Sequence, residues 1–316
     1  MLITDIFLYL SSFIAIWLGA GLIIKSVDRI AHKLRLSSFA VSFFILGLLT
    51  SIPETAVSLS AVAEGKPEIF VGTLLGGVVV IYLLVIPILA ILGKGIKINH
   101  QLDKKNLALA LAVTAAPGLL VIDHKVTNLE GLLLIGFYLT LFYFVQRKHG
   151  VLDSEKIETL NLKVFSFLDL LKVMLGIGIV FVSSQFIVDR TVLFSQQLNI
   201  PAFYLSLLLL SIGTNLPELS LAVRGILSGK KDIAFGDYIG SAAANTLLFG
   251  IFTIINDEEV LTADNFFVTF LFILSAIGFF YFFSKSKNEI SIKEGFILIF
   301  IYLLFIIVEL SKQIIR

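Results

Sequence analysis

Two glutamates lie inside long apolar stretches of the sequence. Glu54 is the only charged residue between Leu36 and Ala63, and Glu218 is the only acidic residue in Ile200–Leu227. A charged side chain at the centre of a membrane-spanning helix costs about 2.5–3.5 kcal/mol on insertion scales. Each of these acids therefore needs a partner, and a cation is a partner of matching chemistry.

The residues before each glutamate supply further oxygen atoms. Thr50-Ser51-Ile52-Pro53 precedes Glu54, and Thr214-Asn215-Leu216-Pro217 precedes Glu218. Proline has no N–H, so it also frees a backbone carbonyl in the preceding turn. Carboxylates, hydroxyls, amides and carbonyls together form an all-oxygen ligand set, which hard cations such as Ca²⁺ prefer. A polar clamp between helices, with each proline as a structural kink, is the alternative.

The two motifs belong to an internal repeat. The second motif begins 164 positions after the first, and several glycines recur at the same offset without gaps. The recurring pairs are Gly65-Lys66 with Gly229-Lys230, Gly72 with Gly236, and Gly76 with Gly240. Repeats with interrupted helices at matching positions indicate a site near the middle of a membrane, where the repeats meet.

The composition places these motifs in a membrane. Of 316 residues, 58% are hydrophobic and 15% are charged, and the mean hydropathy is +1.00. A soluble domain is about 45–50% apolar and about 25% charged. The apolar runs are continuous, so they predict helices and not a β-barrel. We expect an all-α membrane protein with ten transmembrane helices: Ile6–Ile24, Leu36–Ala63, Ile69–Gly93, Asn106–Ile122, Gly131–Gln146, Phe165–Val188, Ile200–Leu227, Ile233–Asn256, Asn265–Ser284 and Ile290–Leu310.

The positions of the basic residues predict the topology. Of the 24 Lys and Arg residues, 19 lie in the loops that follow odd-numbered spans or at the span ends beside those loops. By the positive-inside rule those loops are cytoplasmic, so both termini are expected on the other side of the plasma (cell inner) membrane. We expect a first five-helix repeat at 1–147, a cytoplasmic linker at 148–164 and a second repeat at 165–316. Because five is odd, the second repeat must be inverted.

The motifs resemble those of a known family. Thr-Ser-x-Pro-Glu in the second span and Gly-Thr-x-x-Pro-Glu in the seventh, each followed by a glycine-rich span, are similar to the repeats of the cation/Ca²⁺ exchanger superfamily, the sodium/calcium exchanger-like proteins. The resemblance covers nearly the whole chain. It implies a secondary antiporter in which Glu54 and Glu218 bind the cation. Thr50 and Thr214 would contribute oxygens, with Ser51 and Asn215 in the neighbouring positions.

The chain departs from the family pattern in the third and eighth spans. Gly77 and Ile81 stand where the pattern has a serine and an amide or acid, whereas the eighth span keeps Ser241 and Asn245 and gains Asp237. Fewer side-chain oxygens imply fewer ions in each transport cycle. Asp237 is interpreted either as a helix N-cap or as a relay for protons or cations. Asn245 is either a ligand or an interhelical hydrogen-bonding group.

These observations predict a secondary-active cation antiporter that exchanges Ca²⁺, or a related divalent cation, for H⁺ or Na⁺ by alternating access. The alternative is a cation-binding sensor or structural membrane protein that does not transport. We expect no enzyme activity and no cofactor besides the transported cations, because no intramembrane arrangement of recognisable catalytic chemistry is present and there is no cysteine. The expected partners are inorganic cations and the lipid bilayer. The net charge of +1 excludes a global field for nucleic acid.

Overall fold

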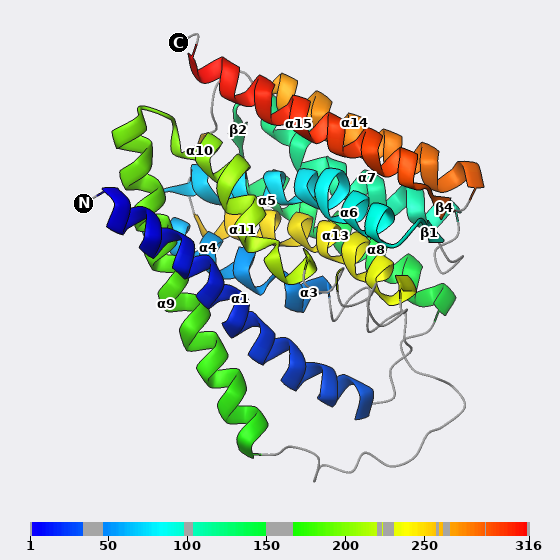
Figure 1. Ribbon diagram of the computed structural model, residues 1–316, viewed down its shortest axis with the longest axis horizontal. Coiled ribbons are helices and arrows are strands. Elements are labelled where there is room, and N and C mark those ends of the chain that lie inside the picture. Colours follow the sequence, from blue (N-terminus) through cyan, green and yellow to red (C-terminus); the bar gives the residue numbers. More distant parts are fainter. Residues whose placement is uncertain are drawn as a thin grey trace.

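The computed structural model describes residues 2–33, 47–97, 104–149, 167–219, 223, 231–256, 259–261, 266–287 and 289–314. It is a bundle of helices (Figure 1), and nine of the helices in this described part are long and apolar enough to cross a membrane. The predicted all-α class is therefore confirmed. Residues 36–46 of the second predicted span and most of the predicted linker lie outside the described residues, so the domain boundaries remain predictions.

The helices follow the order of the predicted spans. Those of the first half are α1 (Leu2–Lys33), α3 (Gly47–Thr50), α4 (Ile52–Ala63), α5 (Pro67–Val80), α6 (Ile86–Leu92), α7 (Lys104–Leu120) and α8 (Asn128–His149). Those of the second half are α9 (Phe167–Leu198), α10 (Ala202–Leu205), α11 (Ser211–Thr214), α13 (Lys231–Ile255), α14 (Phe267–Lys287) and α15 (Ile292–Ile314). The π-helical turns Ile81–Val85 and Ser206–Leu210 join α5 to α6 and α10 to α11.

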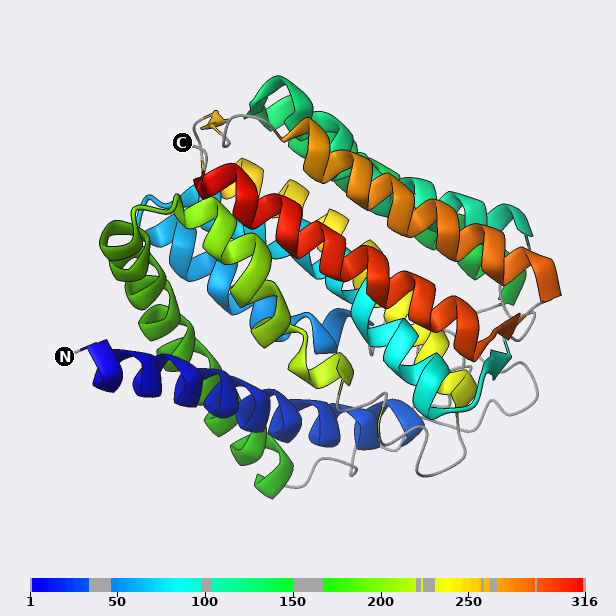
Figure 2. The same ribbon diagram turned by 45° about the horizontal axis from the view of Figure 1, so that its top comes forward.

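α1 and α9 form a long pair along one side of the bundle (Figures 1 and 2). The pair is antiparallel, because Arg190 of α9 pairs with Asp5 near the start of α1, whereas Gly19 of α1 packs against the backbone of Gly176. The ion pair also explains why α9 continues ten residues beyond the predicted end at Val188. The guanidinium has both a carboxylate partner and the Phe186 ring beneath it, so its charge does not end the helix.

Two short antiparallel ladders tie the halves together. β1 (Ile96–Lys97) pairs with β4 (Glu289–Ile290), and β2 (Lys125–Val126) pairs with β3 (Val260–Leu261). β3 begins 164 positions after β1, and β4 begins 164 positions after β2. Each ladder therefore joins one loop to the non-equivalent loop of the other half, as two-fold symmetry between the repeats requires.

The starts of two helices, α8 and α15, are also related by the repeat offset of 164. The backbone N–H of Thr127 donates to Glu130 Oε2 at 2.8 Å, and the backbone N–H of Ser291 donates to Glu294 Oε2 at 2.7 Å. Both pairs are capping boxes, one before α8 and one before α15, and they are 164 positions apart. Together with the antiparallel α1–α9 pair and the crossed ladders, these caps confirm two inverted repeats.

Glycines allow the central helices to cross in backbone contact. A Cβ atom added to Gly47 would lie 2.7 Å from the backbone carbon of Gly240, where α3 crosses α13. One added to Gly76 would lie 2.7 Å from Ser211 Cβ, where α5 meets α11. Gly240 follows Gly76, and Ser211 follows Gly47, by the repeat offset. These two equivalent crossings bring the two acidic motifs to the centre of the bundle.

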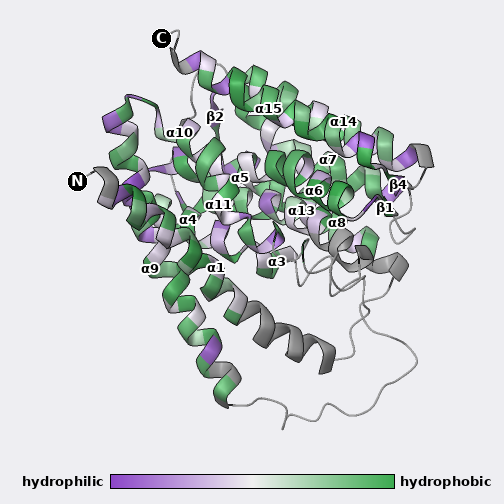
Figure 3. Ribbon diagram, viewed as in Figure 1, coloured by the Kyte–Doolittle hydropathy of each residue, from purple (hydrophilic) through white to green (hydrophobic). Residues whose placement is uncertain are grey.

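The outer helices are apolar on their outward faces. α8 and α15 expose large hydrophobic side chains such as Phe137 and Phe300, whereas α5 is buried from Ile69 to Val80. Figure 3 shows hydrophobic residues along the lengths of α14 and α15. An apolar exterior around a helical core is what the bilayer interior requires, so the chain is a multi-pass membrane protein.

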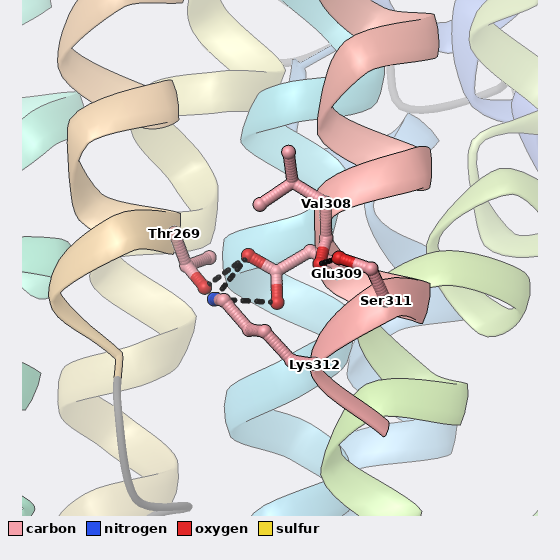
Figure 4. Close-up of polar contacts among 5 residues, drawn as sticks. All are labelled: Thr269, Val308, Glu309, Ser311 and Lys312. Atoms are coloured by element: carbon pink, nitrogen blue, oxygen red, sulfur yellow. Dashed lines mark hydrogen bonds and ion pairs between the residues drawn. The ribbon is translucent and has the colours of Figure 1, made fainter. Parts of the chain in front are cut away.

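A buried carboxylate links α14 to α15 (Figure 4). Glu309 is fully buried, and its Oε1 accepts a hydrogen bond of 2.6 Å from the Thr269 hydroxyl. Lys312 Nζ donates to both carboxylate oxygens at 2.9 Å. The carboxylate is thus neutralised and hydrogen-bonded, which is the condition for holding a charge at such a place.

Lys312→Met should destabilise the protein by about 3 kcal/mol or more, because it leaves the Glu309 carboxylate buried without its cation. The thermal unfolding midpoint of the purified protein in detergent measures this loss. The double variant Glu309→Leu/Lys312→Met removes both charges and should recover most of it. A Lys312→Met protein that unfolds at the wild-type temperature would contradict the assignment.

Candidate cation site

Both acidic motifs interrupt their helices at equivalent residues. The second span breaks at Ser51, between α3 and α4, where φ is −79° and ψ is 11°. The seventh breaks at Asn215, after α11, where φ is −85° and ψ is 13°. Each proline then falls in the first turn of the following helical segment, where its missing N–H costs nothing. The predicted interrupted helices are confirmed, and each break lies one turn before its glutamate.

Glu54 is held by the other half of the chain. Its carboxylate is buried, and Oε1 accepts a hydrogen bond of 3.1 Å from Asn215 Nδ2. The same Nδ2 donates to the Ser211 backbone carbonyl at 2.8 Å. Thr214 lies beside the Glu54 side chain. The motif of the second repeat therefore surrounds the carboxylate of the first.

Glu218 is surrounded in the equivalent way. Its Oε1 accepts a hydrogen bond of 2.9 Å from the Ser241 hydroxyl of α13. That hydroxyl is 3.2 Å from the Ser51 hydroxyl, which in turn donates to the Gly47 carbonyl at 2.8 Å. Thr50 lies beside the Glu218 side chain. The described hydrogen-bond donors to the two carboxylates are an amide and a hydroxyl, so neither donor carries a charge.

Four buried oxygens at this place have no hydrogen-bond partner among the described residues. They are Glu54 Oε2, Glu218 Oε2, Asn215 Oδ1 and Asn245 Oδ1. Both amide groups have their NH₂ ends occupied, since Asn245 Nδ2 donates to the Leu74 carbonyl at 3.4 Å. Leaving a buried acceptor unsatisfied costs about 1–3 kcal/mol. Two carboxylate and two amide oxygens therefore lie buried here without a hydrogen-bond donor among the described residues, and all four are of the oxygen type that hard cations prefer.

The structure brings together eight of the nine candidate residues. Those that it gathers around the two carboxylates are Glu54, Glu218, Thr50, Thr214, Ser51, Asn215, Ser241 and Asn245. The ninth is Asp237, whose side chain lies outside the described residues. Its backbone is inside α13, six residues after the first residue, Lys231. The interpretation of Asp237 as an N-cap is therefore wrong, because the helix begins well before it.

One residue of the site, Gly77, cannot be found by searching the sequence for side chains that could bind a cation. Gly77 has no side chain, but a Cβ atom there would lie 2.8 Å from Asn245 Nδ2 and 3.2 Å from Asn215 Nδ2. The two amides thus meet over the backbone of Gly77. The sequence does carry a signal for this contact, since position 77 is the repeat equivalent of Ser241.

Two inverted five-helix repeats with paired buried carboxylates at matched helix breaks define the class of secondary-active ion transporters. The chain matches the family model described as sodium/calcium exchanger protein over residues 4–146 and 169–310. It belongs to the sodium/calcium exchanger family. The two matched segments correspond to the two halves of the bundle.

Individual relatives agree with this family. The chain is 30% identical over 262 residues to the putative antiporter CaxA of Alkalimonas amylolytica, which covers 81% of this chain and 82% of the relative. It is 23% identical over 335 residues to the sodium/calcium exchanger MaX1 of Methanosarcina acetivorans, covering 92% and 94%. A solved structure of the sodium-calcium exchanger NCX_Mj superposes with a TM-score of 0.69 at 20% identity, covering 96% of this chain and 98% of that one. This likeness shows the ten-helix, two-repeat fold.

Ser241→Ala should lower the stability of the cation-free protein by about 1–3 kcal/mol, because Glu218 Oε1 loses its donor. The thermal unfolding midpoint in the presence of a chelator measures the loss. Ser275→Ala is the matched control, since Ser275 is exposed on α14 and donates only to its own helix at Leu271. Equal midpoints for the two variants would mean that the Ser241 hydroxyl does not support Glu218.

Proposed function

We propose that this chain is a secondary-active antiporter that exchanges Ca²⁺, or a related divalent cation, for H⁺ or Na⁺. The observation that carries the proposal is the set of four buried oxygens, one each from Glu54, Glu218, Asn215 and Asn245, that have no hydrogen-bond partner among the described residues. The names of the related antiporter CaxA and exchanger MaX1 support the same activity.

The chemistry of the four oxygens favours a divalent hard cation. Two carboxylates bring two negative charges into a buried place, and two neutral amide oxygens add ligands without adding charge. Ca²⁺ takes 6–8 oxygen ligands in flexible geometry. Thr50, Thr214, Ser51 and Ser241 are the further oxygens within the site, and water completes the shell.

Competition for the same carboxylates couples the two fluxes. A proton or Na⁺ that occupies Glu54 or Glu218 excludes the divalent cation, and the reverse also holds. Because Gly77 and Ile81 offer no side-chain oxygen, we propose fewer ions in each cycle than in a site with ligands at both positions. Asp237, near the expected cytoplasmic end of α13, is proposed as a relay into the site.

The proposed orientation of the chain in the membrane is based on which loops are rich in Lys and Arg. The loops after odd-numbered spans face the cytoplasm, the linker at 148–164 lies there, and both termini lie on the opposite side of the plasma (cell inner) membrane. Alternating access exposes these four oxygens first to one side and then to the other. The two lateral spans, the first (α1) and the sixth (α9), move against the core that the other helices form.

Glu54→Gln or Glu218→Gln should abolish divalent cation exchange, because each removes one of the two charges that hold the cation. Uptake of radioactive Ca²⁺ into vesicles reconstituted with the purified protein measures the effect. Glu68→Gln is the control, since Glu68 lies in the first turn of α5 and is not one of the four residues whose buried oxygens lack a hydrogen-bond partner. Normal uptake by the double variant Glu54→Gln/Glu218→Gln would contradict the proposal. Ca²⁺ binding by the wild type without any flux would instead indicate a cation sensor.

The coupling ion can be identified in the same vesicles by imposing a pH gradient or a Na⁺ gradient, one at a time. A pH gradient, or a Na⁺ gradient with few ions per Ca²⁺, is expected to drive uptake. Charge movement per Ca²⁺, measured as the membrane potential that stops net flux, gives the stoichiometry. Flux driven by Na⁺ alone with a full multi-ion stoichiometry would overturn the proposal of fewer ions.

A further inference from the structure

Gly77 lies on α5 where the two amide groups of the site converge. Asn215 reaches it from the break of the seventh span, and Asn245 reaches it from α13. A Cβ atom at position 77 would lie 2.8 Å from Asn245 Nδ2 and 3.2 Å from Asn215 Nδ2. Carbon contacts at 2.8 Å do not occur in folded proteins, so any side chain at this position must displace the Asn245 amide.

The repeat shows that the missing side chain is specific to one half. The equivalent of Gly77 is Ser241, whose hydroxyl donates to Glu218 and contacts Ser51. Around Glu218 a side chain from the central helix therefore occupies the space. Gly77 has no side chain, so the equivalent space around Glu54 is filled by the amide groups of Asn215 and Asn245. The two carboxylates thus have different neighbours although their helices are equivalent.

Hydrogen bonds fix the direction of both amides where they pack against Gly77. Asn215 Nδ2 is held by Glu54 Oε1 and the Ser211 carbonyl, and Asn245 Nδ2 is held by the Leu74 carbonyl. With the NH₂ ends held, the two Oδ1 atoms are the ends left without partners. The position of these two oxygens relative to Glu54 therefore depends on how closely the amides approach the backbone at 77.

We propose that Gly77 is a specificity-determining residue, which sets the distance between the amide oxygens and the Glu54 carboxylate and thereby the size of the divalent cation that fits. This inference rests on the proposed function of the same site. Ordinary contact begins near 3.4 Å, so a methyl group at 77 must move the Asn245 amide by about 0.6 Å. Ca²⁺–oxygen distances of about 2.3–2.6 Å differ from Mg²⁺–oxygen distances of about 2.0–2.1 Å by a similar amount.

The test is Gly77→Ala, assayed as Ca²⁺ uptake into reconstituted vesicles with Mn²⁺, Mg²⁺ and Sr²⁺ as competitors. The apparent Ca²⁺ affinity should fall at least tenfold, and the order in which the competitors inhibit uptake should change. Gly136→Ala is the matched control, because Gly136 lies on α8 with nothing within 4 Å of an added Cβ atom. It should keep both the wild-type affinity and the wild-type order.

A double-mutant cycle separates this role from general packing. In an Asn245→Ala background the added methyl group has no Asn245 amide to displace and meets only Asn215 Nδ2 at 3.2 Å, so Gly77→Ala should change affinity and selectivity less than it does in the wild-type background. If Gly77→Ala alone fails to fold, the double variant should fold, because the clashing group is gone. A double variant as poorly folded as the single one would overturn the proposal.

The outcomes distinguish this inference from the proposed function. A wild-type protein that moves no divalent cation contradicts the proposed function. A wild-type protein that transports, together with a Gly77→Ala protein of unchanged affinity and selectivity, overturns only the role of Gly77. Equal losses from Gly77→Ala with and without Asn245 would also overturn it.

Discussion

The requirement that shapes this protein is the burial of two carboxylates at the centre of a membrane bundle. Glu54 and Glu218 are both shielded from solvent and close enough to repel each other. The donors to them are neutral, so the protein supports the two groups without cancelling their charge. A buried pair of like charges is costly unless something neutralises it. In the proposed function a bound cation supplies that neutralisation, whereas Glu309 has a lysine of its own chain, Lys312, as its partner.

The inverted repeat is what makes such a pair available. A single interrupted helix gives one carboxylate, but two-fold repetition gives a second one facing it. The offset of 164 extends from the glutamate motifs to the ladders, the capping boxes and the glycine crossings. Since each feature is duplicated, the two halves form equivalent frames around one site. The frame is symmetric, whereas the side-chain chemistry differs between the halves at positions such as 51, 73, 77 and 81, whose equivalents are Asn215, Asp237, Ser241 and Asn245.

Much of this frame is predictable from the sequence. Long apolar runs identified the spans, and the recurrence of Thr-x-x-Pro-Glu identified the breaks and the paired acids. The ladders were not predictable, because two-residue strands have no periodicity to detect. The end of α9 was placed too early because Asp189 and Arg190 look like loop residues until Asp5 is seen beside Arg190. Of the two interpretations of Asp237, the N-cap is wrong, because a charged residue near a span end resembles a helix start whereas α13 begins six residues earlier, at Lys231.

The candidate site shows the limit of reading ligands from residue types alone. Ser241, Asn215 and Asn245 could be named because each carries an oxygen. Gly77 carries none, so in the sequence it counts only as a lost ligand. In the structure its lack of a side chain is what the two asparagine amides require. Which end of each amide is satisfied depends on Glu54 for Asn215 and on the Leu74 carbonyl for Asn245, and both partners come from helices brought near only by the fold. The repeat allows Gly77 to be found from the sequence, because its equivalent in the second half is Ser241. The comparison shows that the first half lacks a hydroxyl at a position where the second half has one.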